Sequence, residues 1–149
     1  MESWETIARE SIRDLVARYN ANGDTARFEQ VLELFADDAV MVLPDGTYSG
    51  KDEIMTIFTG TRDNLGRDDA ETTAPPPYIR HHTSTHQIDL VDDHTAKGRC
   101  YYQVLTPVGL DHWGRYVDTY RVVDGRWRFA ERRVTVDGRN PDSLFPETN

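Results

Sequence analysis

The chain has 149 residues, of which 38% are hydrophobic and 10% aromatic, which suits a single globular domain and argues against a disordered chain. Its formal net charge of −9 would repel nucleic-acid phosphates and an anionic membrane surface, so we expect neither as a partner. The single cysteine, Cys100, excludes an intrachain disulfide and a cysteine-based zinc or iron–sulfur site. The charged N-terminus lacks the apolar core of a secretory signal, and no apolar run reaches the roughly 18 residues of a membrane span, which predicts a soluble cytoplasmic protein.

The first part of the chain predicts three helices. Apolar residues at helical spacing predict a first helix over residues 4–24, with Gly23 as a stop signal. A second helix is expected at about 25–35, and a third, short helix at 51–60. Between the last two, residues 39–50 contain a Pro-Asp-Gly turn and predict a strand, a turn and a return strand.

The second part of the chain predicts a long loop and then strands. Residues 61–78 are polar and end in three prolines, which predicts a loop that is either disordered or a lid. β-Branched and aromatic residues then predict four strands, over 81–91, 95–108, 115–125 and 126–138, before a weakly structured tail, 139–149. This order indicates one α+β domain over 1–149, with helices packed on one face of a curved, mostly antiparallel sheet. The open end of such a cone suits a small-molecule pocket.

Three of the five histidines, His81, His82 and His86, lie close together in a predicted strand. At a rise of roughly 3.3 Å per residue, His82 and His86 are about 13 Å apart, so one metal ion cannot bind both on a straight strand. Iron or zinc held by these histidines with His112 is the remaining metal hypothesis. Side-chain alternation directs His82 to the core and His81 to solvent, whereas a β-bulge near Thr85 would reverse this. The sequence leaves both orientations open.

Several motifs together resemble a known family. They are Tyr19 and Asp24 in "RYNANGDTARFEQ", the strand opening "RHHTST", and "GRYVDTYRVVDGRWRFAERRV" near the end of the chain. Over roughly residues 5–138 the sequence resembles the SnoaL-like branch of the nuclear transport factor 2-like superfamily. This branch includes scytalone dehydratase, bile-acid 7α-dehydratase and hexachlorocyclohexane dehydrochlorinase.

The resemblance implies catalytic residues inside a cone-shaped α+β barrel. It implies a His–Asp pair made by His81 and Asp24, and a tyrosine at Tyr19. It also implies a late-strand arginine at Arg132, with Arg133 as the alternative. The sequence departs from the family where bile-acid dehydratase-like members carry an acidic residue, because Val104 occupies that position.

Each of these residues also has a purely structural interpretation. Tyr19 suits a core position, Asp24 a cap of the second helix, and Arg132 a solvated face. His112 is expected at the surface of a hairpin tip unless it folds over the mouth of the pocket. The residues expected to contact a substrate or line its pocket are His82, Tyr102, Tyr116, Trp127 and Phe58.

A His–Asp pair would abstract a proton from carbon without a cofactor or metal. The sequence therefore predicts a cofactor-independent dehydratase, isomerase or cyclase acting on a small, partly apolar substrate, such as a polyketide-like or aromatic compound. By analogy with the family, a homodimer formed through the outer face of the sheet is expected. The alternatives are a non-catalytic binding module of the same fold and a structural β-type subunit of a ring-hydroxylating dioxygenase.

Overall fold

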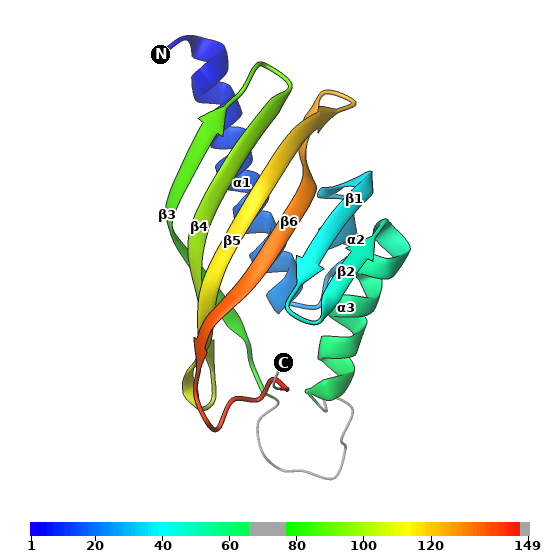
Figure 1. Cartoon of the computed structure of the whole chain (residues 1–149), viewed down its shortest axis with the longest axis vertical. Coiled ribbons are helices and arrows are strands. Elements are labelled where there is room, and N and C mark those ends of the chain that lie inside the picture. Colours follow the sequence, from blue (N-terminus) through cyan, green and yellow to red (C-terminus); the bar gives the residue numbers. More distant parts are fainter. Residues whose placement is uncertain (66–76, 147–149) are drawn as a thin grey trace.

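The computed structural model of the protein describes residues 1–65 and 77–146 (Figure 1). Within them, three helices cover one face of a six-stranded sheet, which confirms the α+β class predicted from the sequence. The helices are α1 (Ser3–Asp24), α2 (Phe28–Leu32) and α3 (Lys51–Asn64). The strands are β1 (Phe35–Leu43), β2 (Gly46–Ser49), β3 (Arg80–Leu90), β4 (Thr95–Thr106), β5 (Gly109–Val123) and β6 (Arg126–Arg139).

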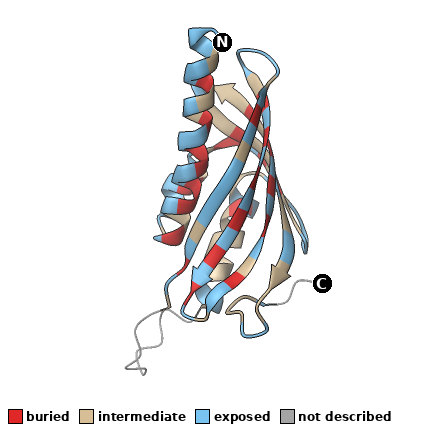
Figure 2. Cartoon of the chain, turned by 90° about the vertical axis from the view of Figure 1, so that its left-hand side faces the viewer, coloured by how far each residue is buried: buried red, intermediate tan, exposed pale blue. Residues whose placement is uncertain are grey.

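Helix α1 packs lengthwise against the sheet, and its buried stripe faces the strands (Figure 2). The stripe is the apolar set that the helical spacing predicted: Ala8, Ile12, Leu15, Val16 and Tyr19. At the N-terminus, Glu2 and Glu5 form a reciprocal capping box. The helix continues one residue past Gly23, so its last residue is Asp24, which is buried.

Two of the helices, α2 and α3, differ in extent from the prediction. Helix α2 is short because Ala26 has a positive φ of 60° and Phe35 already belongs to β1. Helix α3 includes residues 61–64, which were predicted to start the long loop. The rest of that predicted loop falls largely on residues 66–76, which lie outside the described part of the chain.

The strand order is β2-β1-β6-β5-β4-β3, and the sheet is curved and unclosed. All neighbouring strands are antiparallel except β1 and β6, which pair in parallel. The Asp124-Gly125 turn joins β5 to β6 with positive φ at both residues, as a tight hairpin requires.

Two β-bulges set which side chains face the helices. In β3, Thr85 and His86 lie opposite the single residue Cys100, and Thr85 has a φ of 54°, which is costly for a β-branched residue. In β5, Leu110 and His112 pair with the neighbouring β4 residues Leu105 and Val104, so Asp111 between them is an extra residue. Because each bulge shifts the register by one residue, it reverses the alternation on one side of it.

The concave face of the sheet is the core, and the convex face is exposed. Along β4 buried and exposed residues alternate regularly, as expected for a sheet covered on one side. The exposed face still carries large apolar side chains, among them Tyr101, Trp113 and Val117. Within the described residues, no helix is both long and apolar enough to cross a membrane.

Candidate active site

A cavity of about 190 Å³ lies between the C-terminal end of α1, helix α3 and the concave face of the sheet. Much of its wall is apolar and comes from Phe28, Met41, Leu43, Ile57, Phe58 and Ile79. The polar residues in its lining are Tyr19, Asn20, Asp24, Thr61, Arg62, His81, Tyr102, His112 and Tyr116.

His81 and Asp24 form a hydrogen-bonded pair at this cavity. The Nδ1 atom of His81 lies 2.6 Å from Oδ1 of Asp24, and the backbone N–H of His81 donates to Oδ2 at 2.8 Å. A carboxylate only accepts hydrogen bonds, so in the neutral imidazole Nδ1 carries the proton and Nε2 holds the free electron pair. The side chain of His81 is 20% exposed, and the ring lines the cavity.

The bulge in β3 explains why His81, and not His82, faces inward. The shift at Thr85 places His81 opposite the buried Val104, and His82 opposite Gln103 on the exposed face. Both oxygens of Asp24 are engaged by His81, and α2 has no side-chain cap hydrogen bond. Asp24 therefore does not cap the second helix.

Tyr19 reaches the cavity from α1, one turn before Asp24. Its ring lies edge-on to four aromatic rings, including those of Phe58 and Tyr116. Burial raises the pKa of Tyr19 above its usual value, although the positive charge of Arg132 opposes this. At neutral pH the hydroxyl is therefore protonated and can donate a proton.

Arg132 lies beneath the cavity and does not line it. Its side chain is 0% exposed and forms a two-point ion pair with Asp118, with Nε to Oδ1 at 2.8 Å and Nη2 to Oδ2 at 2.9 Å. Burial alone would lower the pKa of Arg132, but pairing with Asp118 raises it. The guanidinium carbon lies 4.3 Å from the ring centre of Tyr19 and 3.8 Å from that of Tyr116, so Arg132 supports two rings of the cavity.

The ion pair continues into a buried polar chain. Asp118 accepts a hydrogen bond from the hydroxyl of Tyr120 at 2.8 Å, and that hydroxyl lies 3.1 Å from Nε2 of His86. His86 is thus turned inward by the same bulge as His81, but it lies outside the cavity lining.

The predicted substrate-contacting residues divide into two groups. Phe58, Tyr102 and Tyr116 line the cavity. His82 is exposed on the opposite face, and Trp127 lies near the start of β6, away from the cavity, so the structure places neither at this site. Arg133 is also exposed, with its side chain outside the cavity lining.

The hydroxyls of the two lining tyrosines have protein partners. Tyr102 donates to the carbonyl of Thr135 at 3.0 Å, and Tyr116 donates to Oδ1 of Asn20 at 3.4 Å. Their rings stack with centres 4.6 Å apart. Both hydroxyls are therefore already engaged, and burial raises the pKa of both groups.

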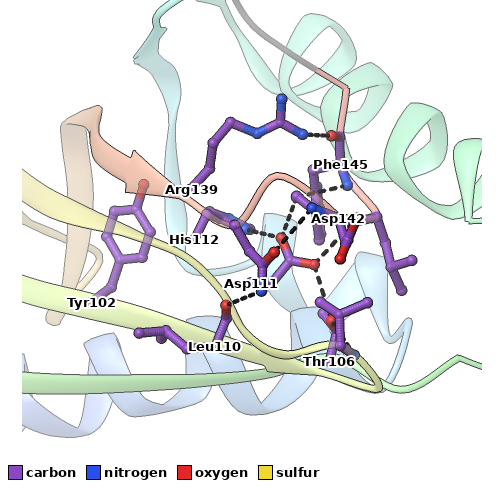
Figure 3. Close-up of polar contacts among 12 residues, drawn as sticks. Tyr102, Thr106, Leu110, Asp111, His112, Arg139, Asp142 and Phe145 are labelled. Carbon is purple, nitrogen blue, oxygen red and sulfur yellow. Dashed lines mark hydrogen bonds and ion pairs between the residues drawn. The ribbon is translucent and has the colours of Figure 1, made fainter.

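His112 corrects a prediction from the sequence. It was expected at the surface of a hairpin tip unless it folded over the mouth of the pocket. Instead it lies within β5 (Figure 3), its side chain is 13% exposed, and it lines the cavity. Its Nδ1 lies 2.7 Å from Oδ1 of Asp111. Simple alternation places adjacent residues of a strand on opposite faces, so only the bulge at Asp111, which the sequence does not reveal, brings this pair together.

The histidine cluster lacks the geometry of a metal site. Across residues 1–65 and 77–146, the one group of three potential ligands within reach of one ion is Asp92, Asp93 and His94, which is exposed. His81 and His82 point to opposite faces of the sheet, so they cannot share an ion.

The chain belongs to the SnoaL-like domain family, whose family model matches residues 4–133. No curated protein sequence matches the chain significantly.

Solved structures of this fold are similar over nearly the whole chain. A candidate scytalone dehydratase from Novosphingobium aromaticivorans is 20% identical, with 94% of this chain and 91% of that chain covered and a TM-score of 0.78. A hexachlorocyclohexane dehydrochlorinase from Novosphingobium barchaimii is 15% identical, with 97% and 98% covered and a TM-score of 0.75. The β subunit of a candidate aromatic-ring-hydroxylating dioxygenase from Novosphingobium aromaticivorans is 20% identical, with 91% and 93% covered and a TM-score of 0.72. At these identities the likeness concerns the fold alone.

Proposed function

We propose that the protein is a cofactor-independent lyase or isomerase that removes a carbon-bound proton from a small, partly apolar substrate. The observation that carries this proposal is the His81–Asp24 pair, with Nδ1 held at 2.6 Å by a buried carboxylate and the ring at the cavity surface. A carboxylate in this position fixes the imidazole tautomer and makes Nε2 a better base.

The chemistry follows from the groups around that base. Nε2 of His81 takes a proton from a carbon next to a carbonyl, or from a carbon whose neighbour bears a leaving group. Tyr19, whose hydroxyl is protonated at neutral pH, donates a proton to a departing hydroxyl or a developing enolate. Elimination, isomerisation and ring closure all begin with this proton abstraction.

The cavity favours a compact ring as substrate. An apolar cavity of about 150 Å³ holds one benzene molecule, so a cavity of about 190 Å³ limits the buried part of a substrate to about one ring and its substituents. Phe28, Met41 and Phe58 supply apolar contact on one side, and the tyrosine and histidine rings supply the other.

Scytalone and hexachlorocyclohexane, named by the structural neighbours, are the first substrates to test. Dehydration is followed by absorbance and dehydrochlorination by chloride release. On a confirmed substrate, His81→Gln and Asp24→Asn should each lower turnover by about 100-fold or more. His82→Gln, on the exposed face of the same strand, is the matched control and should leave turnover unchanged. Full turnover in His81→Gln would contradict the proposal, and ligand binding without turnover in the wild type would favour a non-catalytic binding module.

We also propose a homodimer formed through the convex face of the sheet. Support comes from its exposed apolar side chains, Tyr101, Trp113 and Val117. Sedimentation should give a dimer for the wild type and a monomer for Val117→Lys. A wild type that stays monomeric and binds a large partner would favour a dioxygenase β-type subunit, an alternative suggested by one neighbouring fold.

A further inference from the structure

The cavity contains a second histidine–carboxylate pair, formed by His112 and Asp111 on β5 (Figure 3). Asp111 is fully buried and accepts hydrogen bonds from Thr106 Oγ1 at 2.9 Å, from the backbone N–H of Leu144 at 2.9 Å and from the hydroxyl of Ser143. With His112 Nδ1 at 2.7 Å, four donors surround this carboxylate. Burial alone would raise the pKa of Asp111, but these hydrogen bonds lower it below its usual value.

An ionised Asp111 determines which nitrogen of His112 is available. Nδ1 donates to the carboxylate, and Nε2 makes no hydrogen bond among the described residues. Burial lowers the pKa of His112, and the hydrogen bond to Asp111 offsets this only in part, so the ring is neutral at pH 7. Nε2 of His112 is therefore a hydrogen-bond acceptor at the cavity.

The two histidines lie in one row across three strands. His81 pairs with Val104 on β4, and Val104 pairs with His112 on β5. Two strand spacings separate the backbones of His81 and His112 by about 10 Å. The ring of Tyr102 lies beside both, with its centre 6.3 Å from that of His81 and 6.1 Å from that of His112. A ring bound in the cavity beside Tyr102 can therefore contact both histidines.

Packing alone does not account for this arrangement. The ring of His112 packs edge-on against Phe145, with centres 4.6 Å apart, and the tail is held by Ser143 and Leu144 through Asp111. A phenylalanine at position 112 would provide the same ring contact, and the tail contacts to Asp111 do not require an imidazole. The imidazole adds one feature, an oriented acceptor at the cavity.

We propose that His112, positioned by Asp111, binds the substrate by accepting a hydrogen bond from a hydroxyl group, so that the cavity selects small hydroxylated ring compounds. This binding role rests on the proposed function in one respect, namely that the reacting carbon of the substrate lies next to His81. The hydroxyl lies at the opposite side of the ring from that carbon.

Phenol and toluene, which differ by a hydroxyl in place of a methyl, are suitable probes. Their dissociation constants are measured by NMR with the full chain carrying ¹⁵N-labelled histidine. We expect the ratio of the toluene to the phenol dissociation constant to fall by about fivefold in His112→Phe relative to the wild type. His82→Phe, on the exposed face, should leave the ratio unchanged. An unchanged ratio in His112→Phe, or no binding of either probe by the wild type, would overturn the proposal.

Two further measurements keep the test independent of catalysis and of folding. Repeating the comparison in His81→Gln separates the proposals, because binding selectivity should persist there even though proton abstraction is lost. In the wild type, phenol should shift the ¹⁵N signal of His112 Nε2 and leave that of His82 unchanged, which needs no variant.

The positioning role of Asp111 is tested separately. In Asp111→Asn, His112 should lose its single tautomer. Retention of that tautomer would show that Asp111 does not position the ring.

Discussion

Replacing Asp118 by asparagine should remove a large part of the protein's stability, because Arg132 would remain charged and buried without a counter-ion. Both side chains are 0% exposed, and two hydrogen bonds of 2.8 and 2.9 Å join them. Removing one partner of a buried ion pair costs about 3–5 kcal/mol, against a total of about 5–15 kcal/mol for a typical domain. At about 2–4 °C per kcal/mol, the melting temperature should fall by about 6–20 °C.

Urea and thermal unfolding followed by circular dichroism measure this loss. Asp137→Asn is the matched control, because its pair with Arg115 is exposed at 3.3 Å and should contribute less than about 1 kcal/mol. Replacing both partners, as Asp118→Leu with Arg132→Met, should restore most of the stability, since no buried charge remains. A loss for Asp118→Asn no larger than for Asp137→Asn would show that buried Arg132 does not depend on Asp118 as its counter-ion.

The double variant also separates support of the cavity from contact with the substrate. Arg132 has no exposed surface and lies against the rings of Tyr19 and Tyr116. Turnover of the folded double variant should therefore stay within about tenfold of the wild type. A loss of about 100-fold at native stability would mean that the charge of Arg132 acts on the reaction.

Three further outcomes are expected. Gly114→Ala should destabilise the fold by about 1–3 kcal/mol in urea unfolding, because a Cβ there would lie 1.8 Å from a carbonyl oxygen of β6. Gly60→Ala is the matched control: its Cβ would meet open space, so it should stabilise helix α3 by up to about 1 kcal/mol. Folding lowers the pKa of both His112 and Asp111, so the folded state binds fewer protons than the unfolded state. The melting temperature should therefore fall as the pH drops below about 6.5. Between pH 7 and 5, the melting temperature of His112→Asn should fall less steeply than that of the wild type. Phe145→Ala should expose the ring of His112 and move its pKa, read by NMR titration, back toward the ordinary histidine value.

The regular parts of the fold were predictable because their side chains repeat with the period of the element. The stripe of α1 and the alternation of β4 each follow one period over many residues, so small errors at the ends did not matter. His81 and Asp24 are 57 positions apart, so no local pattern connects them. Their pairing was predicted only from the resemblance to a family.

The remaining features depend on tertiary structure. Whether His81 or His82 faces inward depends on the bulge at Thr85, and the inward position of His112 depends on the bulge at Asp111. Neither bulge has a glycine to signal it. Arg132 suited a solvated strand face in the sequence, and only its contact with Asp118 explains its complete burial.

The proposed catalytic base is tested most directly by determining the tautomer of His81 from long-range ¹H–¹⁵N spectra of the wild type and of Asp24→Asn. We expect wild-type His81 to carry its proton on Nδ1 alone, and we expect this preference to be lost in Asp24→Asn while His82 is unaffected. If His81 shows the same mixture of tautomers as the exposed His82 in both proteins, the pair does not form, and the proposed base does not exist.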